Sequence, residues 1–327
     1  MGNASPESIR AFLSDLAIGQ PRAFSHADLK IYTPDLSKSI KIKSDQFGDV
    51  YKGQFRDGKY ITVKVLTVDV VEDIFMSEVK ILSNASHRNL VKLYGYCFEH
   101  DMKAVVYEYM ENGSFDKLLY QNPHKIEWVK FYNIATETAK GLAYLHEGCD
   151  NQIIHYDIKV GNVLLDSKFS PKIADFGISK LIEKDRSHIT LTKTRGTPGY
   201  AAPEMWKERS RVTCKCDVYS FGMMLFEVLR MRINKEEGQD WFPPQVWDKF
   251  NKGQLDNIIE GCGIKEKYRE KARILSKVAL WCSQFVPEDR PSMSNVVKML
   301  EMQIPVNDPT DPLLVSISQS ASTTTHQ

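Results

Sequence analysis

The chain has 327 residues, enough for one large domain or for two lobes with their own cores, because single cores stop growing near roughly 250 to 300 residues. Hydrophobic residues make up 42% and charged residues 26%, which is ordinary for a soluble globular protein. The formal net charge of +1 excludes a global attraction to nucleic acid or to an acidic membrane, so any charged site must be local.

The N-terminal stretch, residues 1–36, is polar and irregular, and we expect it to be a tail. Its start, MGNASP, places Gly2 after Met1 as in N-myristoylated proteins, but Pro6 stands where that pattern requires Ser or Thr. We therefore expect a cytoplasmic protein, with peripheral attachment to the plasma membrane as the weaker alternative. No stretch approaches about eighteen apolar residues, and no basic segment precedes an apolar one, so neither a membrane span nor a secretory signal is predicted.

Strand patterns dominate the first third of the folded part. Asp57-Gly58 joins two apolar runs and is a strong signal for a β-hairpin. The predicted elements are, in chain order, strands over 50–55 and 60–65, a helix over 71–84, and strands over 90–97 and 103–110.

Helical patterns dominate after the stretch ENGSF, with apolar residues at spacings of three and four. The predicted helices cover 128–147, 217–230, 268–284 and 292–302. A strand-rich lobe therefore precedes a helical lobe, and the join over 108–113 is the natural place for a cleft. Residues 303–327 are rich in Ser and Thr, and we expect a disordered tail there.

The six cysteines are scattered along the chain. Cys214 and Cys216 are separated by one residue, whereas paired zinc ligands usually have two to four residues between them. We therefore expect reduced thiols and no zinc site.

Charged residues follow one another in an order that fits chemistry on a phosphate. Phosphoryl transfer needs cations around the γ-phosphate, metals held by carboxylate and amide oxygens, and an acceptor for the proton of the nucleophile. The chain supplies these groups as Lys64 in YITVK, Glu78 on the next predicted helix, Asp157, Lys159 and Asn162 in IIHYDIKVGNVLLD, Asp175 in DFG, and Glu204 at the end of AAPE.

Each motif alone is a weak signal, but in this order and at these separations the chain resembles the eukaryotic protein kinases over residues 37–302. The resemblance implies an α+β bilobal fold. A small β-rich N-lobe would cover about 37–107, a hinge 108–113, and a larger helical C-lobe 114–302.

Longer stretches narrow the resemblance to plant receptor-like kinases, in particular the branch similar to leaf rust resistance receptor kinases. They are GLAYLHEGCDNQIIHYDIK, TRGTPGYAAPE, CDVYSFGMMLFEVL and ALWCSQFVPEDRPSM. The resemblance implies protein substrates bearing Ser or Thr, an upstream receptor or co-receptor kinase as partner, no nucleic-acid partner, and a role in defence signalling. Receptors of that branch have a membrane helix, for which this sequence has no candidate stretch.

The resemblance assigns the reacting groups residue by residue. Asp157 matches the catalytic Asp that accepts the proton of the substrate hydroxyl, and Lys159 matches the cation beside the transferring phosphate. Asn162 and Asp175 match the ligands of Mg²⁺, with Mn²⁺ as an alternative ion.

The same resemblance implies an ATP site. Lys64, paired with Glu78, should reach the α and β phosphates, and the backbone of Glu108 and Met110 should bind adenine. The implied nucleotide-binding residues are Ile42, Lys43, Ser44, Asp45, Gln46, Phe47, Gly48, Asp49, Val50, Thr62, Lys64, Tyr107, Glu108, Met110 and Leu164.

Three further roles follow from the resemblance. Lys159 within DIKxxN, together with GTPGY before APE, resembles the serine/threonine group of kinases. Glu204 and Arg290 match a buried ion pair of the helical lobe, and Asp217 matches the Asp that supports the catalytic loop.

The chain departs from the family at its glycine-rich loop. In KSDQFGDV, Lys43 and Asp45 occupy two of three glycine positions and only Gly48 remains, so backbone amides should approach phosphate less closely. At an effective dielectric of about 20, the charge of Asp45 would cost at most about 2 kcal/mol of ATP affinity. We expect weakened, not abolished, ATP binding.

Two further differences concern the adenine pocket. Thr62 adds a hydroxyl where the family usually has Ala, and a rotamer that turns it to the backbone would make it harmless. Tyr107 is bulky and should close the back of the pocket to large inhibitors, unless it is simply core.

Tyr156 stands where kinases governed by activation-loop phosphorylation have Arg before the catalytic Asp, which makes this a non-RD sequence. Tyr156 carries no charge, so phosphates on Thr190, Thr192 or Thr194 should not switch the enzyme through that contact. The alternative, that Tyr156 merely packs beneath the loop, is compatible with this. The two functional hypotheses are an active Mg-ATP-dependent serine/threonine kinase and a catalytically weak or silent pseudokinase that acts as a binding scaffold.

Overall fold

The computed structural model describes residues 13, 21–45, 47–67, 71–121, 126–182, 188–190, 196–207, 209–234 and 241–310. Several predictions lie outside these residues, namely those on Gly2, Gln46, Thr192, Thr194 and the tail over 311–327. The side chain of Asp45 also lies outside the described part. The chain forms two compact units, one of Met1–Gly113 with Leu164–Leu181 and one of Ser114–Val163 with Ile182–Gln327.

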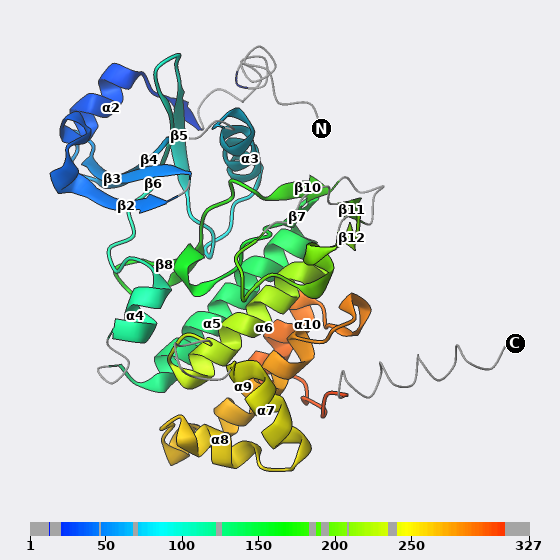
Figure 1. Ribbon diagram of the computed structural model, residues 1–327. Coiled ribbons are helices and arrows are strands. Elements are labelled where there is room, and N and C mark those ends of the chain that lie inside the picture. Colours follow the sequence, from blue (N-terminus) through cyan, green and yellow to red (C-terminus); the bar gives the residue numbers. More distant parts are fainter. Residues whose placement is uncertain are drawn as a thin grey trace, which may run out of the picture. The chain divides into compact units, whose positions relative to one another are not determined.

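The first unit contains a six-stranded sheet in the order β1-β5-β6-β4-β3-β2 (Figure 1). Its neighbouring strands run antiparallel, except that β1 pairs parallel with β5. The strands are β1 (Arg22–Ala23), β2 (Lys41–Asp45), β3 (Gly48–Gln54), β4 (Tyr60–Leu66), β5 (Leu93–Phe98) and β6 (Lys103–Glu108).

The predicted hairpin at Asp57-Gly58 is confirmed. The N–H of Phe55 donates to the carbonyl of Lys59, and the carboxylate of Asp57 accepts a hydrogen bond of 3.0 Å from the N–H of Lys59. This turn connects β3 to β4 and places Tyr60 opposite Gln54, so the register of the two longest strands follows from it.

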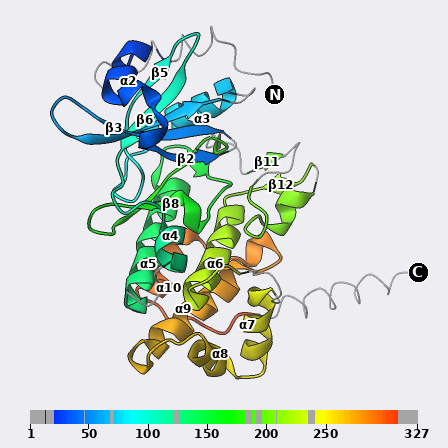
Figure 2. The same ribbon diagram turned by 60° about the vertical axis from the view of Figure 1, so that its left-hand side comes forward.

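Side chains of β4 alternate between the two faces of the sheet. Ile61 and Val63 are fully buried in a core on one face, whereas Lys64 belongs to the other face, because successive side chains of a strand point to opposite sides. Helix α3 (Val71–Asn84), predicted over 71–84, lies beside the sheet (Figures 1 and 2). It covers the face of Lys64 through Phe75, whose ring packs against that of Tyr96.

The predicted N-terminal tail over 1–36 is wrong from Arg22 onward. Helix α2 (His26–Tyr32) begins with a capping box, in which Ser25 and Asp28 satisfy each other's backbone N–H groups. Phe24 and Leu29 are buried in the core on the face of Ile61. The prediction failed because two buried side chains in a polar stretch give too weak a pattern.

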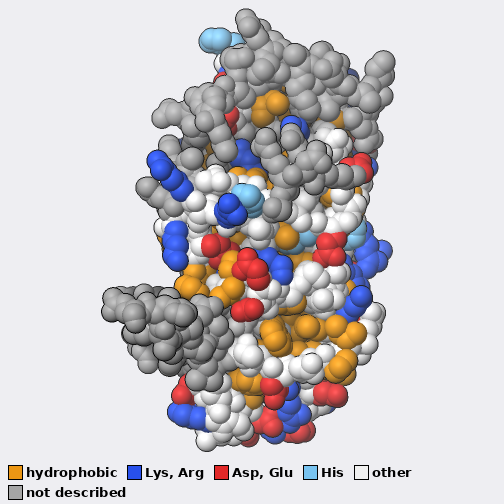
Figure 3. Space-filling model, turned by 90° about the vertical axis from the view of Figure 1, so that its right-hand side faces the viewer, with side chains coloured by type: hydrophobic (Ala, Val, Ile, Leu, Met, Phe, Trp, Pro, Cys, Tyr) orange, Lys and Arg blue, Asp and Glu red, His pale blue; other side chains and the backbone are white. Residues whose placement is uncertain are grey.

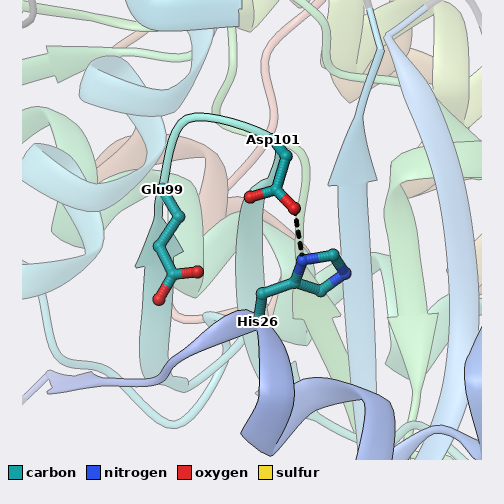
Figure 4. A group of neighbouring side chains, drawn as sticks. All are labelled: His26, Glu99 and Asp101. Atoms are coloured by element: carbon teal, nitrogen blue, oxygen red, sulfur yellow. Dashed lines mark hydrogen bonds and ion pairs between the residues drawn. The ribbon is translucent and has the colours of Figure 1, made fainter.

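The start of α2 is fastened to the turn between β5 and β6 (Figure 4). His26 Nδ1 lies 2.8 Å from Asp101 Oδ2. One side-chain nitrogen of His26 and one carboxylate oxygen each of Glu99 and Asp101 all lie within 4.8 Å of one another. Hydrogen bonds from its own backbone and from His26 hold the pKa of Asp101 below its ordinary value. Asp101 is 62% exposed at its side chain, so this contact orients α2 more than it stabilises it.

The second unit is helical, and other helices of the unit lie on both sides of α6 (Figures 1 and 2). Almost all side chains of α6 between Cys216 and Leu229 are buried. All the helices predicted here are present, with ends shifted by one or two residues where caps decide them, and α5 runs on into a π-helix over Tyr144–Gly148. The helices are α4 (Phe115–Gln121), α5 (Trp128–Ala143), α6 (Lys215–Arg230), α7 (Phe242–Asn251), α8 (Leu255–Gly261), α9 (Arg269–Cys282) and α10 (Met293–Leu300).

Short elements frame the loops that carry the motifs. They are the strands β7 (Gln152–Ile154), β8 (Val163–Leu165), β9 (Pro171–Ile173), β10 (Lys180–Ile182), β11 (Ile189–Thr190) and β12 (Arg211–Val212), and the 3-10 helices η5 (Val160–Asn162) and η6 (Pro203–Trp206). A sheet-rich unit and a helical unit together confirm the predicted α+β fold class.

The predicted disordered tail is wrong for residues 303–310, which are bonded to α9 and the residues that follow it. Trp281 Nε1 donates to the carbonyl of Asn307 at 2.9 Å, and Gln284 Nε2 donates to that of Thr310 at 3.0 Å. Lys277 and Asp308 add an ion pair of 2.6 Å. Side-chain donors on a helix surface therefore order a segment whose own composition predicts disorder.

Basic and acidic side chains are interspersed on the face shown in Figure 3, in keeping with the small net charge. Across the described ranges, no helix combines the length and the apolar character needed to span a bilayer. All six cysteines are free thiols, as predicted.

Leu29→Ala should destabilise the sheet-rich unit by about 2 to 5 kcal/mol, because Leu29 is fully buried and its truncation leaves a cavity. Ile31→Ala is the matched control, since Ile31 is on the same helix and is 60% exposed, and its cost should stay below about 0.5 kcal/mol. Urea unfolding of both variants measures the difference. Equal stabilities of the two variants would show that α2 does not belong to the core.

Candidate active site

Lys64 joins three elements of the sheet-rich unit. Its ammonium, on β4, lies 2.8 Å from Asp175 Oδ1 after β9 and 3.4 Å from both carboxylate oxygens of Glu78 on α3. Lys64 is 5% exposed and Glu78 is 1% exposed. The predicted Lys64–Glu78 pair is therefore present, and one buried cation stands between two carboxylates.

Burial dominates the electrostatics of Glu78. Loss of water raises its pKa above the ordinary value, and the charge of Asp175 acts in the same direction. The ammonium of Lys64 opposes this shift, and so does the hydroxyl of Tyr107. Tyr107 is 7% exposed, so it is a core residue that also acts on the Glu78 carboxyl.

The DFG segment is bonded to α3 and contains a residue in a strained backbone conformation. Ser77 on α3 donates hydrogen bonds of 2.8 Å to the carbonyls of Phe176 and Ser179. Asp175 has a φ of +70°, a conformation that costs a residue with a Cβ and that must be maintained by its surroundings. The contacts between α3 and the DFG segment therefore help to hold Asp175 in a conformation that its own backbone does not favour.

Asp157, in the loop before η5 of the helical unit, has a carboxylate bonded by three donors. Lys159 Nζ and Asn162 Nδ2 donate to Oδ2 at 2.8 Å, and Thr197 Oγ1 donates to Oδ1 at 2.5 Å. Lys159 Nζ also lies 2.7 Å from Thr197 Oγ1. Asp157 is 7% exposed, and the three donors determine the orientation of its carboxylate.

Asn162 is oriented by the same network. Its Nδ2 donates both to the carboxylate and to the backbone carbonyl of Asp157, each at 2.8 Å. Because both donor hydrogens are used, the oxygen Oδ1 is the atom left to face a ligand. An amide oxygen is a ligand that Mg²⁺ accepts.

Asp217 at the start of α6 supports this loop from below, as predicted. Its fully buried carboxylate accepts hydrogen bonds of 2.8 Å from the backbone N–H groups of His155 and Tyr156, and lies 3.0 Å from His146 Nε2. Tyr156 has a φ of +68° and is 1% exposed, so it packs inside the unit in a strained conformation that Asp217 helps to hold.

Thr197 was missed as a site residue, although GTPGY was recognised as a motif. The preceding Gly196 has a φ of +91°, and a Cβ there would lie 3.0 Å from the carbonyl oxygen of Tyr156. The turn therefore requires glycine, and it brings the Thr197 hydroxyl to Asp157. In the sequence, only the glycine at position 196 could have indicated that Thr197 lies close to Asp157.

A second missed group surrounds Glu227 on α6. Tyr120 and Tyr200 both donate to Glu227 Oε2, and the N–H of Asn234 donates to Oε1 at 3.2 Å. Burial raises the pKa of Glu227, while these three donors lower it. Since Tyr200 belongs to GTPGY, the group fastens the loop of Thr197 to α6.

The predicted ion pair between Glu204 and Arg290 is present. Arg290 donates to both Glu204 oxygens at 2.6 and 2.8 Å, and it is 1% exposed. The rest of its guanidinium donates to the carbonyls of Gln284, Lys215 and Phe285. Removing either partner would leave an uncompensated buried charge.

The segment that keeps one of the three glycines of the glycine-rich loop still forms a hairpin of β2 and β3, with Asp45 opposite Gly48. Gly48 has a φ of +153°, and a Cβ there would lie 2.0 Å from the carbonyl oxygen of Val65, so this position requires glycine. The ring of Phe47 lies 5.7 Å from Lys64 Nζ, and Lys43 is exposed. Asp49 pairs with Lys41 at 2.7 Å, which lowers the Asp49 pKa.

The remaining predicted nucleotide residues belong to the same unit. Val50, Thr62 and Leu164 are half-buried, Ile42 is 42% exposed, Ser44 is exposed and Met110 is buried. The carboxylate of Glu108 lies 2.8 Å from Lys172 Nζ and accepts from the N–H of Lys92, so this side chain braces the segment predicted to bind adenine. The rotamer expected of Thr62 stays a prediction.

The structure thus assembles two groups of predicted site residues. Lys64, Glu78 and Asp175 meet in the sheet-rich unit. Asp157, Lys159 and Asn162 meet in the helical unit. One group offers a cation that can bind phosphates and a carboxylate that can bind a metal ion, and the other offers a carboxylate that can accept a proton.

Comparison with known proteins identifies the class. Residues 36–300 match the model of the family described as protein tyrosine and serine/threonine kinase. The chain therefore belongs to the protein kinase family, which uses ATP and a divalent metal.

Relatives from Arabidopsis thaliana confirm the resemblance to plant receptor-like kinases. The chain is 40% identical over 305 residues to leaf rust 10 disease-resistance locus receptor-like protein kinase-like 2.3, covering 90% of this chain and 47% of that protein. It is 41% identical over 294 residues to PR5-like receptor kinase, covering 85% and 44%. It is 38% identical over 307 residues to G-type lectin S-receptor-like serine/threonine-protein kinase SD2-5, covering 91% and 37%. The chain thus spans about half or less of these relatives.

Glu227→Gln should reveal the raised pKa of the Glu227 carboxyl through the pH dependence of the unfolding free energy. A carboxyl whose pKa is higher in the folded than in the unfolded state costs stability as pH rises from the ordinary value of 4.5 through the folded pKa. The variant does not titrate there, so the wild-type advantage in unfolding free energy should shrink as pH rises above the ordinary value of 4.5. Denaturant unfolding of both proteins measures it. A growing advantage would mean that the tyrosine donors outweigh burial.

Proposed function

We propose that the chain is an ATP- and Mg²⁺-dependent protein kinase that phosphorylates Ser and Thr on protein substrates. The observation that carries this proposal is the Asp157 carboxylate, which Lys159, Asn162 and Thr197 hold in one orientation. A carboxylate in that arrangement can accept the proton of a hydroxyl, and Lys159 can neutralise charge on the transferring phosphoryl group.

Asn162 and Asp175 are the proposed metal ligands. Their donor set fits, because the Asn162 amide is turned to leave its oxygen and Asp175 supplies a carboxylate. Bound Mg²⁺, or Mn²⁺ in its place, would neutralise charge on the ATP phosphates. Lys64 would bind the α and β phosphates, with its position determined by Glu78.

Specificity for Ser and Thr has two supports. Lys159 and Thr197 share a hydrogen bond beside the carboxylate of Asp157, and they belong to the motifs DIKxxN and GTPGY, which resemble those of the serine/threonine group. One relative, at 38% identity, is named a serine/threonine-protein kinase. The family itself includes tyrosine kinases, so acceptor analysis must decide.

A pseudokinase that acts as a binding scaffold is the second candidate. Lys43 and Asp45 in the glycine-rich loop favour it, because two glycines that would let backbone amides approach phosphate are missing. Against it, Lys64 and Asp175 are hydrogen-bonded in the sheet-rich unit, and Asp157 is hydrogen-bonded to Lys159 and Asn162 in the helical unit. We therefore prefer the active enzyme.

The biological setting is inferred from the relatives. Several are named for disease resistance or as receptor kinases, so we propose defence signalling, with a receptor or co-receptor kinase upstream. We place the catalytic domain over 37–302, with α2 packed on it. A cytoplasmic location agrees with these assignments.

Asp157→Asn should lower phosphate transfer to a protein substrate by roughly 10² to 10⁴-fold, because the proton acceptor is lost. Nucleotide binding should persist, since Lys64 and Asp175 are untouched. Radiolabelled ATP with Mg²⁺, followed by phosphoamino-acid analysis, gives both rate and acceptor.

Asp150→Asn is the control for this experiment, because Asp150 is an exposed Asp on the same unit. It should transfer phosphate at the wild-type rate. Negligible and equal transfer by wild type and Asp157→Asn would remove the enzymatic proposal and favour the scaffold.

A further inference from the structure

Three potential metal ligands from two distant segments meet in the sheet-rich unit (Figure 4). His26 lies on α2, whereas Glu99 and Asp101 lie in the turn that joins β5 to β6. One ligand atom of each residue lies within 4.8 Å of the other two. The imidazole distinguishes this cluster from an acidic patch, because imidazole suits ions such as Zn²⁺, whereas Mg²⁺ and Ca²⁺ prefer oxygen ligands alone.

Backbone hydrogen bonds hold both segments in place. The capping box of Ser25 and Asp28 orders the first turn of α2, where His26 lies. In the turn after β5, the N–H of Glu99 donates to the carbonyl of Met102 at 2.9 Å, and the N–H of Met102 donates to that of Glu99 at 3.3 Å. The ligands are therefore close together before an ion binds, which lowers the entropic cost of binding.

The distances fit a zinc ion after small side-chain movements. Zn²⁺ binds imidazole nitrogen and carboxylate oxygen at about 2.0 to 2.2 Å, so two ligands of a tetrahedral ion lie about 3.4 Å apart. The 2.8 Å between His26 Nδ1 and Asp101 Oδ2 must lengthen slightly, and the exposed Glu99 side chain must move inward. The ion would replace the proton that now joins His26 to Asp101, and this proton would pass to water.

The charges of the cluster suit a divalent cation. At neutral pH two carboxylates supply two negative charges, and an imidazole is neutral. The ammonium of the neighbouring Lys103 donates to the carbonyl of His100 at 3.1 Å and lies 4.0 Å from a carboxylate oxygen of Glu72, so other partners bind this cation. The Asp101 side chain is 62% exposed, so water can complete the coordination of an ion.

We propose that His26, Glu99 and Asp101 bind a Zn²⁺ ion, with water in the fourth position. The cluster contains no cysteine, so the cysteine spacing that argued against a zinc site does not bear on it. The ion would join α2 to the turn between β5 and β6, in place of one exposed contact. Helix α2 precedes the part of the chain that matches the kinase family, so this site is separate from the Mg²⁺ site proposed for the nucleotide.

Calorimetric titration of the full chain with Zn²⁺, in excess Mg²⁺, tests the site. One Zn²⁺ should bind per chain, because Mg²⁺ does not compete for an imidazole. His26→Ala and Asp101→Asn should each weaken binding at least about tenfold, since groups that only orient a metal ligand are already worth about 10 to 100-fold. Asp101→Asn keeps the size of the side chain, so the test does not depend on how well His26→Ala folds.

His100→Ala is the matched control, because His100 is an exposed histidine that lies between two of the ligands in sequence and outside the cluster. It should bind Zn²⁺ as the wild type does. Absence of binding by the wild type, or wild-type affinity in both His26→Ala and Asp101→Asn, would overturn the proposal. Equal losses in His100→Ala and Asp101→Asn would overturn the choice of ligands.

Titration with Co²⁺ separates this site from the cysteines. Nitrogen and oxygen ligands should give visible absorption bands without the charge-transfer band of a thiolate, and the visible bands should disappear in Asp101→Asn. A thiolate band that persists in Asp101→Asn, with no other band lost, would assign the ion to cysteine and overturn the proposal.

Amide hydrogen exchange tests the attachment of α2. At a Zn²⁺ concentration about ten times the Kd, any opening that breaks the site should be suppressed about tenfold. The amides of Leu29 and Thr33, which are hydrogen-bonded within and at the end of α2, should therefore exchange more slowly in the wild type and at an unchanged rate in Asp101→Asn. Unchanged exchange in a wild type that binds Zn²⁺ would contradict the role in attachment. These measurements need no phosphate transfer, so their failure is distinct from failure of the proposed kinase activity.

Discussion

The helical unit depends on one buried anion, the carboxylate of Asp217. It accepts two backbone N–H groups and faces His146, and each hydrogen bond to a charged group is worth about 1.5 to 3 kcal/mol. These bonds hold Tyr156 at a positive φ, and that conformation directs the chain into Asp157. Without the anion, the backbone at His155 and Tyr156 would lose the two hydrogen bonds that help to offset this strain. The carboxylate of Asp157, the proposed proton acceptor, is therefore positioned from α6, a helix far along the sequence.

The same principle recurs in the other charged groups. Lys64 lies between Glu78 and Asp175, and Arg290 binds Glu204 with both of its terminal nitrogens. Lys64, Glu78 and Arg290 are buried, so the charge of each is favourable only while its partners are in place. Such networks connect elements distant in sequence and leave the reacting atoms with few alternatives. That arrangement suits phosphoryl transfer, in which positioning and charge do most of the catalysis.

The sequence predicted the long periodic elements well, and α3 was predicted over its full length because its apolar face repeats clearly. It did not predict β2, whose residues were assigned to a degenerate phosphate loop, nor α2, in which only Leu29 is buried. Strand β5 begins later than predicted, because Leu90 and Val91 instead bond to the neighbourhood of Ile173. Such long-range pairing leaves no local pattern in the sequence.

Within the site, the family resemblance supplied the identity of the charged residues, but not the contacts that orient them. The bond from Thr197 to Asp157 spans 40 positions and requires the turn at Gly196. The group around Glu227 is also invisible in the sequence, because an isolated Glu on an apolar helix gives no indication of its two tyrosine donors. Physical proximity, not spacing along the chain, decides these roles.

Asp217→Asn tests the central claim most directly, because the amide has the shape of the carboxylate but lacks its charge and one acceptor. The measurement is the rate of phosphate transfer from Mg-ATP to a protein substrate, together with nucleotide affinity and the unfolding midpoint of the same sample. The account predicts a transfer rate lower by at least about tenfold, equivalent to one lost charged hydrogen bond, in a folded protein that binds nucleotide as before. Wild-type transfer by the folded variant would contradict it.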